Sequence, residues 1–178
     1  MMARPPNAWH DVATAAETRS PPGIEIALVT LEERCMHEDV SIIIACEQAI
    51  RRFALYNDRH DHAGLAALFT DDGVFARPSA PDAPVRGREA ILQSFRERAP
   101  PTTCHLMLNT LVSVQSHTLA HAHSHVLLYT AGDTSAAPPW TAQSPALLGS
   151  FEDVLVLQQG RWLFQQRLGS LLLRVGTG

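Results

Sequence analysis

The spacing of apolar residues changes near Pro101, and this change limits the folds open to the chain. Between residues 39 and 98, apolar residues recur mostly every three or four positions, as in helices that bury one face. Between residues 103 and 175 they recur every two positions, as in strands of a half-buried sheet. Helices followed by consecutive antiparallel strands predict an α+β domain whose core lies between the helices and one face of the sheet.

Three helices are expected in the first half of the chain. The first runs from Asp39 to about Asn57, the second spans residues 62–69 behind an N-cap at Asp61, and the third spans residues 87–98. A short strand is expected at residues 74–77, followed by a Pro-rich loop at 78–86. A first hairpin is expected from strands 103–115 and 119–130, and a second from strands 147–157 and 162–175, with a polar loop at 132–145 between them.

Residues 1–37 differ from the rest of the chain. Pro and Gly interrupt any regular pattern there, so we expect a disordered or extended tail before a domain at residues 38–178. The segment also lacks the basic start and the long apolar stretch of a secretory signal. Because the helical pattern begins directly after Met36, this methionine is a candidate for the true start of the protein.

Charge and composition exclude several classes of function. The net charge is −4 and no basic run occurs, so we expect no nucleic-acid partner. No apolar stretch approaches the roughly 20 residues that span a bilayer, so we expect no membrane association. Three widely spaced cysteines without a CxxC motif indicate free thiols in a reducing compartment, which predicts a cytoplasmic location. They are Cys35, Cys46 and Cys104.

Several short motifs resemble, in order, those of SnoaL-like proteins in the nuclear transport factor two-like superfamily. They are YNDRHD at 56–61, LAALFTDDGVF at 65–75, VRGREAI at 85–91, CHLMLN at 104–109, GSFED at 149–153, and GRW at 160–162 with QR at 166–167. The resemblance covers roughly residues 40–172 and implies a cystatin-like α+β roll. In that fold three N-terminal helices pack on a curved antiparallel sheet, which forms a cone around an apolar pocket. The superfamily includes dehydratases, isomerases, cyclases, epoxide hydrolases and non-catalytic subunits, so the fold leaves the chemistry open.

Within the superfamily, the pattern of polar residues is most similar to the scytalone dehydratase family. That family uses a Tyr-Asp pair at the end of the first helix and two histidines on the long strands. Asp58 matches its acidic residue, His105 matches its first histidine, and the second falls within residues 120–125. The chain departs from the pattern at the tyrosine, because Asn57 precedes Asp58 and Tyr56 lies one residue further back.

The resemblance implies a catalytic set of Asp58, His105 and either His123 or His125. Asp58 would accept the N–H of His105 and fix its tautomer, His105 would act as general base, and the other histidine would act as general acid. The alternatives are that Asp58 only caps the next helix and that His105 is a core histidine bonded to a backbone carbonyl.

The segment AHAHSH at residues 120–125 allows two orientations. His121, His123 and His125 share one strand face, because side chains repeat every two residues. If this face lines the pocket, one histidine can protonate a leaving group. If it faces outward, it forms a solvated or dimer-facing stripe and Ser124 points inward. A third hypothesis is a zinc site that His105 completes from the neighbouring strand.

We therefore expect a cofactor-independent acid–base lyase or isomerase of the dehydratase type, without a metal. Its substrate would be a small hydrophobic cyclic or aromatic hydroxy compound. The residues expected to contact this substrate are Tyr56, Asn109, Phe53, Phe69, Met107, Ser124 and Phe151. The alternatives are a non-catalytic subunit, like the small subunit of ring-hydroxylating dioxygenases, or a histidine-ligated metalloenzyme. The resemblance also implies a homodimer or higher homo-oligomer formed through the outer sheet face.

Overall fold

The structure is a computed structural model that describes residues 24–98 and 101–176, with side chains from residue 38 onward. The chain divides into two units, Met1–Met36 and His37–Gly178. The sheet and the two shorter helices belong to the second unit. Residues 1–23 lie outside the described residues, so the expectation of a tail stays a prediction there.

Helix α1 spans Ile24–Asp58, so it begins upstream of the expected start at Asp39. Residues 24–37, expected to be extended or disordered, are therefore helical. The physical reason is visible in the sequence: after Gly23 neither Gly nor Pro occurs again before Gly64, so nothing interrupts a helix. Beyond residue 38 the helix buries a face with the predicted spacing. Its buried apolar residues are Ile42, Cys46, Ala49, Ile50, Phe53 and Ala54.

Two shorter helices follow. Helix α2 covers His62–Ala66, and the Asp61 carboxylate accepts a hydrogen bond of 2.8 Å from the Gly64 N–H, which confirms the predicted N-cap. The helix ends earlier than expected because Phe69 already belongs to a strand. Helix α3 covers Arg88–Arg96 and buries Ile91 and Phe95.

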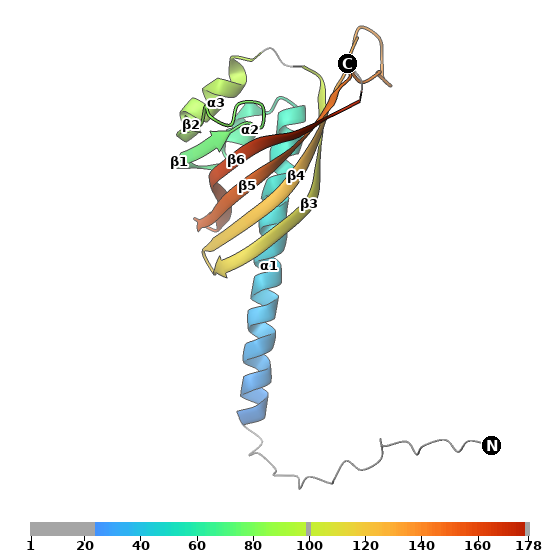
Figure 1. Ribbon diagram of the computed structural model, residues 1–178. Helices are drawn as coiled ribbons and strands as arrows, with labels where there is room; N and C mark the ends of the chain where they lie inside the picture. The colour runs from blue at the N-terminus through green and yellow to red at the C-terminus, as the bar shows by residue number, and fades with distance from the viewer. Residues whose placement is uncertain (1–23, 99–100, 177–178) are drawn as a thin grey trace, which may run out of the picture. The chain divides into compact units, whose positions relative to one another are not determined.

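Six strands form one sheet in the order β2-β1-β6-β5-β4-β3 (Figure 1). Their bounds are β1 Phe69–Ala76, β2 Val85–Arg86, β3 Thr103–Ser116, β4 Leu119–Thr130, β5 Ala146–Gln158 and β6 Arg161–Val175. The last four strands form the two predicted hairpins and pair antiparallel. The architecture is therefore the predicted α+β class, with helices on a curved six-stranded sheet.

Strands β1 and β2 differ from the expected arrangement in two ways. Strand β1 pairs parallel with β6, with Phe75 opposite Arg167. No tight turn joins these two strands, which lie far apart in the sequence, so nothing forces them to run antiparallel. Strand β2, which falls in the segment expected to be loop, pairs antiparallel with β1 at the sheet edge.

A cluster of aromatic rings fills the core. The Phe53 ring from α1 lies at its centre, 5.5–6.2 Å from five other phenylalanine rings. These rings belong to Phe69, Phe75, Phe95, Phe151 and Phe164. The cluster joins α1 and α3 to three strands, so it fixes the helices over the inner face of the sheet.

A β-bulge interrupts strand β3 at Asn109, which has a positive φ of 49°. Leu108 pairs with His125 and Leu111 pairs with His123, so two residues of β3 stand opposite the single residue Ser124. Such an extra residue reverses which face the following side chains occupy.

The bulge corrects one sequence prediction. In an uninterrupted strand His105, Met107, Asn109 and Leu111 would share one face, because side chains repeat every two residues. His105 and Met107 do lie on the inner face, but Leu111 lies beyond the bulge and is 68% exposed. After the bulge the even-numbered residues, beginning with the buried Val112, turn inward.

Candidate active site

Asp58 and His105 meet where the end of α1 approaches the start of β3. The Asp58 Oδ1 atom lies 2.6 Å from His105 Nδ1, and Asp58 Oδ2 accepts the His105 backbone N–H at 2.9 Å. Thr103 Oγ1 donates a further hydrogen bond of 2.9 Å to Asp58 Oδ1. The two side chains are mostly buried, with 15% of His105 and 21% of Asp58 exposed.

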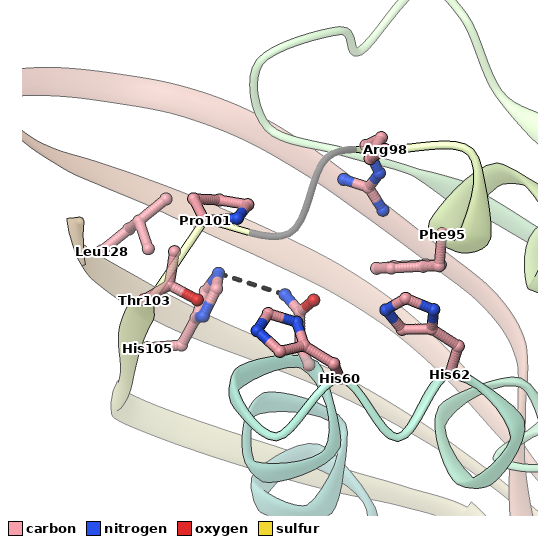
Figure 2. Close-up of a pocket in the computed structure, with 9 residues that line it drawn as sticks. His60, His62, Phe95, Arg98, Pro101, Thr103, His105 and Leu128 are labelled. Atoms are coloured by element: carbon pink, nitrogen blue, oxygen red, sulfur yellow. Dashed lines mark hydrogen bonds between the residues drawn. The ribbon is translucent and has the colours of Figure 1, made fainter. Parts of the chain in front are cut away.

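These contacts set the tautomer of the neutral imidazole. An ionised carboxylate only accepts hydrogen bonds, so His105 Nδ1 carries the proton and Nε2 carries the lone pair. The Asn57 side-chain amide lies 3.3 Å from Nε2 and donates to it (Figure 2, dashed line). The arrangement presents a basic nitrogen whose ring orientation is fixed from both sides.

The same contacts keep Asp58 ionised. Burial raises the pKa of this carboxyl, but hydrogen bonds from the His105 ring and backbone, with one from Thr103, outweigh burial and hold the pKa of Asp58 below its ordinary value. An ionised Asp58 stabilises the positive charge that His105 acquires when it accepts a proton.

His105 borders a cavity of about 360 Å³ between the end of α1, the end of α3 and the inner face of β3 and β4. The residues that line it are Asn57, His60, His62, Phe95, Arg98, Pro101, Thr103, His105 and Leu128 (Figure 2). A deeper and more apolar cavity of about 120 Å³ shares Asn57, Phe95, Arg98, His105 and Leu128 with the first. The imidazole therefore stands where the two cavities meet.

The sequence and the fold both match one known family. Residues 38–168 match the family described as SnoaL-like domain, over well more than half of the chain. The chain belongs to the SnoaL-like domain family.

Solved structures similar to this SnoaL-like domain confirm the fold. A candidate scytalone dehydratase from Novosphingobium aromaticivorans is 23% identical, with a TM-score of 0.64, covering 78% of this chain and 89% of that one. A hexachlorocyclohexane dehydrochlorinase, LinA type 2, is 16% identical, with a TM-score of 0.64 and coverages of 76% and 88%. A protein of unknown function from Mycobacterium tuberculosis is 25% identical, with a TM-score of 0.60 and coverages of 77% and 74%. No curated protein matches the sequence.

Some of the residues expected to contact the substrate line the cavities of this SnoaL-like domain, and others do not. Phe53 and Phe151 line the deeper cavity. Phe69 is wholly buried in the core, and Tyr56 and Met107 pack against that core, but none of the three lines either cavity.

Three other predicted residues lie on the outer face of the sheet, away from His105. His123 Nδ1 lies 2.6 Å from Glu152 Oε1 on β5. His125 Nδ1 lies 3.4 Å from the Asn109 amide, which the bulge places there. The structure therefore contradicts the expectation that His123 or His125 acts as general acid beside His105, and the expectation that Asn109 contacts the substrate in the pocket. The physical reason is the register of β4, which turns Ser124 inward instead.

Ser124 is completely buried, but it does not line either cavity. Its hydroxyl has no hydrogen-bond partner within the described part of the chain. The outward direction of the neighbouring histidines also separates them from His105, so these residues cannot share a zinc ion. Within residues 24–98 and 101–176 no cluster of three metal-binding side chains occurs.

Sequence reasoning missed the other polar residues of the site, namely Asn57 as a partner of His105, together with His60, His62, Arg77 and Arg98. Asn57 was noted only as a departure from a tyrosine. Arg98 entered only as the last residue of the expected third helix. The signal that could have found it is its position at the helix end, where the chain turns toward β3.

Two of the missed residues, His62 and Arg98, have pKa values below their ordinary values. Burial lowers the pKa of His62, and the nearby His60, Arg98 and Arg96 lower it further, so the neutral imidazole is favoured. Burial also lowers the pKa of Arg98 to about 10, with a smaller contribution from Arg77. Arg98 therefore still carries its charge at neutral pH. Its guanidinium lies 4.1 Å from the centre of the Phe95 ring.

A buried ion pair lies behind the deeper cavity. Arg167 Nη1 lies 2.7 Å from Asp153 Oδ2, and neither side chain has any exposed surface. The guanidinium also lies 3.9 Å from the Phe151 ring centre and 4.5 Å from that of Phe53. Since these two rings line the cavity, the pair supports the cavity wall.

No helix in the described part of the chain combines the length and the apolar character needed to cross a bilayer.

Proposed function

We propose that this protein is a lyase that eliminates water from a small hydrophobic cyclic or aromatic hydroxy compound. The observation that carries the proposal is the Asp58–His105 pair at the junction of two cavities, with Nε2 as the basic nitrogen. A positioned imidazole of this kind contributes roughly 10²–10⁴-fold to a proton transfer.

In the proposed reaction the substrate displaces the Asn57 amide from His105 Nε2, and the freed lone pair takes a proton from a carbon next to a carbonyl group. The electron pair of the broken C–H bond forms the new C=C bond, and the C–O bond to the neighbouring hydroxyl breaks. The imidazolium, stabilised by Asp58, then gives its proton to the departing oxygen, which leaves as water. This route needs a single acid–base residue, which agrees with the absence of His123 and His125 from the cavity lining.

One observation supports elimination over isomerisation, and a second supports a hydrophobic cyclic substrate. The similar structures include a candidate dehydratase and a dehydrochlorinase, and both names describe eliminations. The deeper cavity is walled by Phe53, Phe75, Phe151 and other apolar residues, which favour a hydrophobic ring system.

The test uses 3-hydroxy-1-tetralone, a small bicyclic β-hydroxy ketone whose dehydration yields 1-naphthol and can be followed by absorbance. We expect turnover by the wild-type protein and a loss of about 10²-fold or more in His105→Ala. His123→Ala is the matched control, because it removes an imidazole from the same sheet on its outer face, and it should retain activity. Full activity in His105→Ala, or no turnover by the wild type across related cyclic β-hydroxy ketones, contradicts the proposal.

A further inference from the structure

The charged residues around the two cavities are all of one sign. The lining contains the two cationic side chains Arg77 and Arg98, and no described Asp or Glu contributes to it. The chain as a whole carries a net charge of −4, so this local excess of positive charge runs against its composition. Asp58 lies behind His105 and is engaged by three hydrogen bonds.

The two arginines lack counter-ions. Across the described residues, every carboxylate found in an ion pair with an arginine is paired with Arg51, Arg88 or Arg167, and none with Arg77 or Arg98. Arg98 donates from Nε to the Ser94 carbonyl at 3.0 Å, while its Nη2 atom is buried without a hydrogen-bond partner in the described chain. A half-buried guanidinium without a counter-ion, and with one nitrogen lacking a hydrogen bond, is costly, so an anionic oxygen in the cavity would stabilise it.

The position of Arg98 relative to His105 also favours an anionic ligand. Arg98 borders both cavities and enters them from the end of α3, whereas His105 enters from β3 (Figure 2). A ligand in these cavities can therefore contact a fixed positive charge and the basic nitrogen together. Burial and Arg77 hold the pKa of Arg98 at about 10, which leaves the guanidinium charged at neutral pH.

We propose that Arg98, assisted by Arg77, is an anion receptor, and that the substrate carries a carboxylate or an ionised phenol or enol oxygen. The inference rests on the proposed function, because it names a class of substrate for that site. The binding that it predicts can be measured without turnover. It narrows the ligand class from any hydrophobic ring to a ring that bears an anionic oxygen.

The test compares 2-naphthoate with its neutral analogue 2-naphthamide, by isothermal titration calorimetry near neutral pH. We expect the wild-type protein to bind naphthoate about tenfold or more tightly than naphthamide, in line with a charge-assisted hydrogen bond. Arg98→Gln should remove most of this preference without weakening naphthamide binding, and Arg98→Lys should retain part of it. Arg96→Gln is the matched control, because Arg96 is exposed on the same helix and lines neither cavity.

Equal affinity for the two compounds, a preference that survives in both Arg98→Gln and Arg77→Gln, or binding of neither compound overturns the assignment. Circular dichroism and thermal unfolding of each variant show whether it is folded, and Arg98→Lys provides the test if Arg98→Gln is not. His105→Ala separates the two proposals, because it should keep the preference for naphthoate while abolishing turnover. Loss of the preference in that variant also contradicts the anion receptor.

Discussion

The Asp58 carboxylate accepts hydrogen bonds from both the ring and the backbone N–H of His105, so a helix end and a strand start are joined at two points of one residue. This double contact fixes the position of the imidazole relative to the main chain, and it also fixes the tautomer of the ring. A carboxylate at a helix C-terminus faces the negative end of the macrodipole, and these contacts offset that cost.

Asp58→Asn should reduce turnover of a responsive cyclic hydroxy ketone by about 10²-fold or more, even though an amide has nearly the same shape. An amide that donates to Nδ1 favours the tautomer with the proton on Nε2, which removes the base. The measurement is kcat/KM for Asp58→Asn, His105→Ala and the double variant. Because the two residues act as a unit, the double variant should be little worse than His105→Ala alone. Simple multiplication of the two single effects would contradict this arrangement.

Asp58 also predicts a pH dependence of stability. Its pKa is lower in the folded protein than the value of about 3.9 expected in the unfolded chain. The stabilisation is therefore complete above the unfolded value and is lost as the pH falls through the folded value. Urea unfolding of Asp58→Asn should show a shallower decline in the free energy of unfolding below about pH 4 than the wild type shows. Glu89→Gln, which alters an exposed carboxylate, should leave the wild-type decline in place.

Arg167→Met should destabilise the fold by about 3–5 kcal/mol, because it leaves the Asp153 carboxylate buried without its partner. Burial already raises the pKa of Asp153 to about 6, against the opposing effect of Arg167. The double variant Arg167→Met with Asp153→Leu removes both charges and should recover part of the loss. Chemical denaturation measures both variants. If the double variant is no more stable than Arg167→Met, the unpaired charge is not the cause.

Gly169→Ala should cost about 1–3 kcal/mol, since an added Cβ would lie 2.5 Å from the backbone nitrogen of Pro78. Pro78 lines the deeper cavity, so its displacement should also alter binding of 2-naphthamide. Thermal unfolding and calorimetry check the two effects. Ser170→Ala, at the next and exposed position, should change neither.

The bulge residue Asn109 tests the backbone of β3. Its positive φ of 49° suits glycine, so Asn109→Gly should be close to neutral in stability. Asn109→Val should cost about 1–2 kcal/mol, because a β-branched residue is disfavoured in the left-handed region. Urea unfolding of the pair measures the difference, and equal stability of the two variants would show that this backbone geometry is not required.

Much of the fold follows from local patterns that the sequence displays directly. The change of hydrophobic period predicts the helices and both hairpins, and Asp61 predicts the start of α2. The early start of α1 and the parallel pairing of β1 with β6 were not predicted. The early start of α1 could be inferred only from the absence of Gly and Pro between Gly23 and Gly64. The parallel pairing depends on a contact between distant parts of the chain, which no local spacing encodes.

The site divides in the same way. The resemblance in short motifs led to Asp58 and His105, which the structure brings together. It did not reveal that strand parity changes within β3, so Asn109 and the strand histidines were placed on the wrong face. Arg98 was missed because a charged residue at a helix end is usually solvated, and only the return of the chain toward β3 places it at a cavity.

The extra residue at Asn109 divides strand β3 into two parts whose inward side chains face different regions of the protein. Thr103 and His105, before it, border the larger cavity, whereas Val112, after it, belongs to the packed interior. A change before the bulge therefore acts on the site, including the hydrogen bond from Thr103 to Asp58, while the interior of the fold stays intact. In natural divergence, the same separation would let substitutions change substrate preference without lowering the stability of the core.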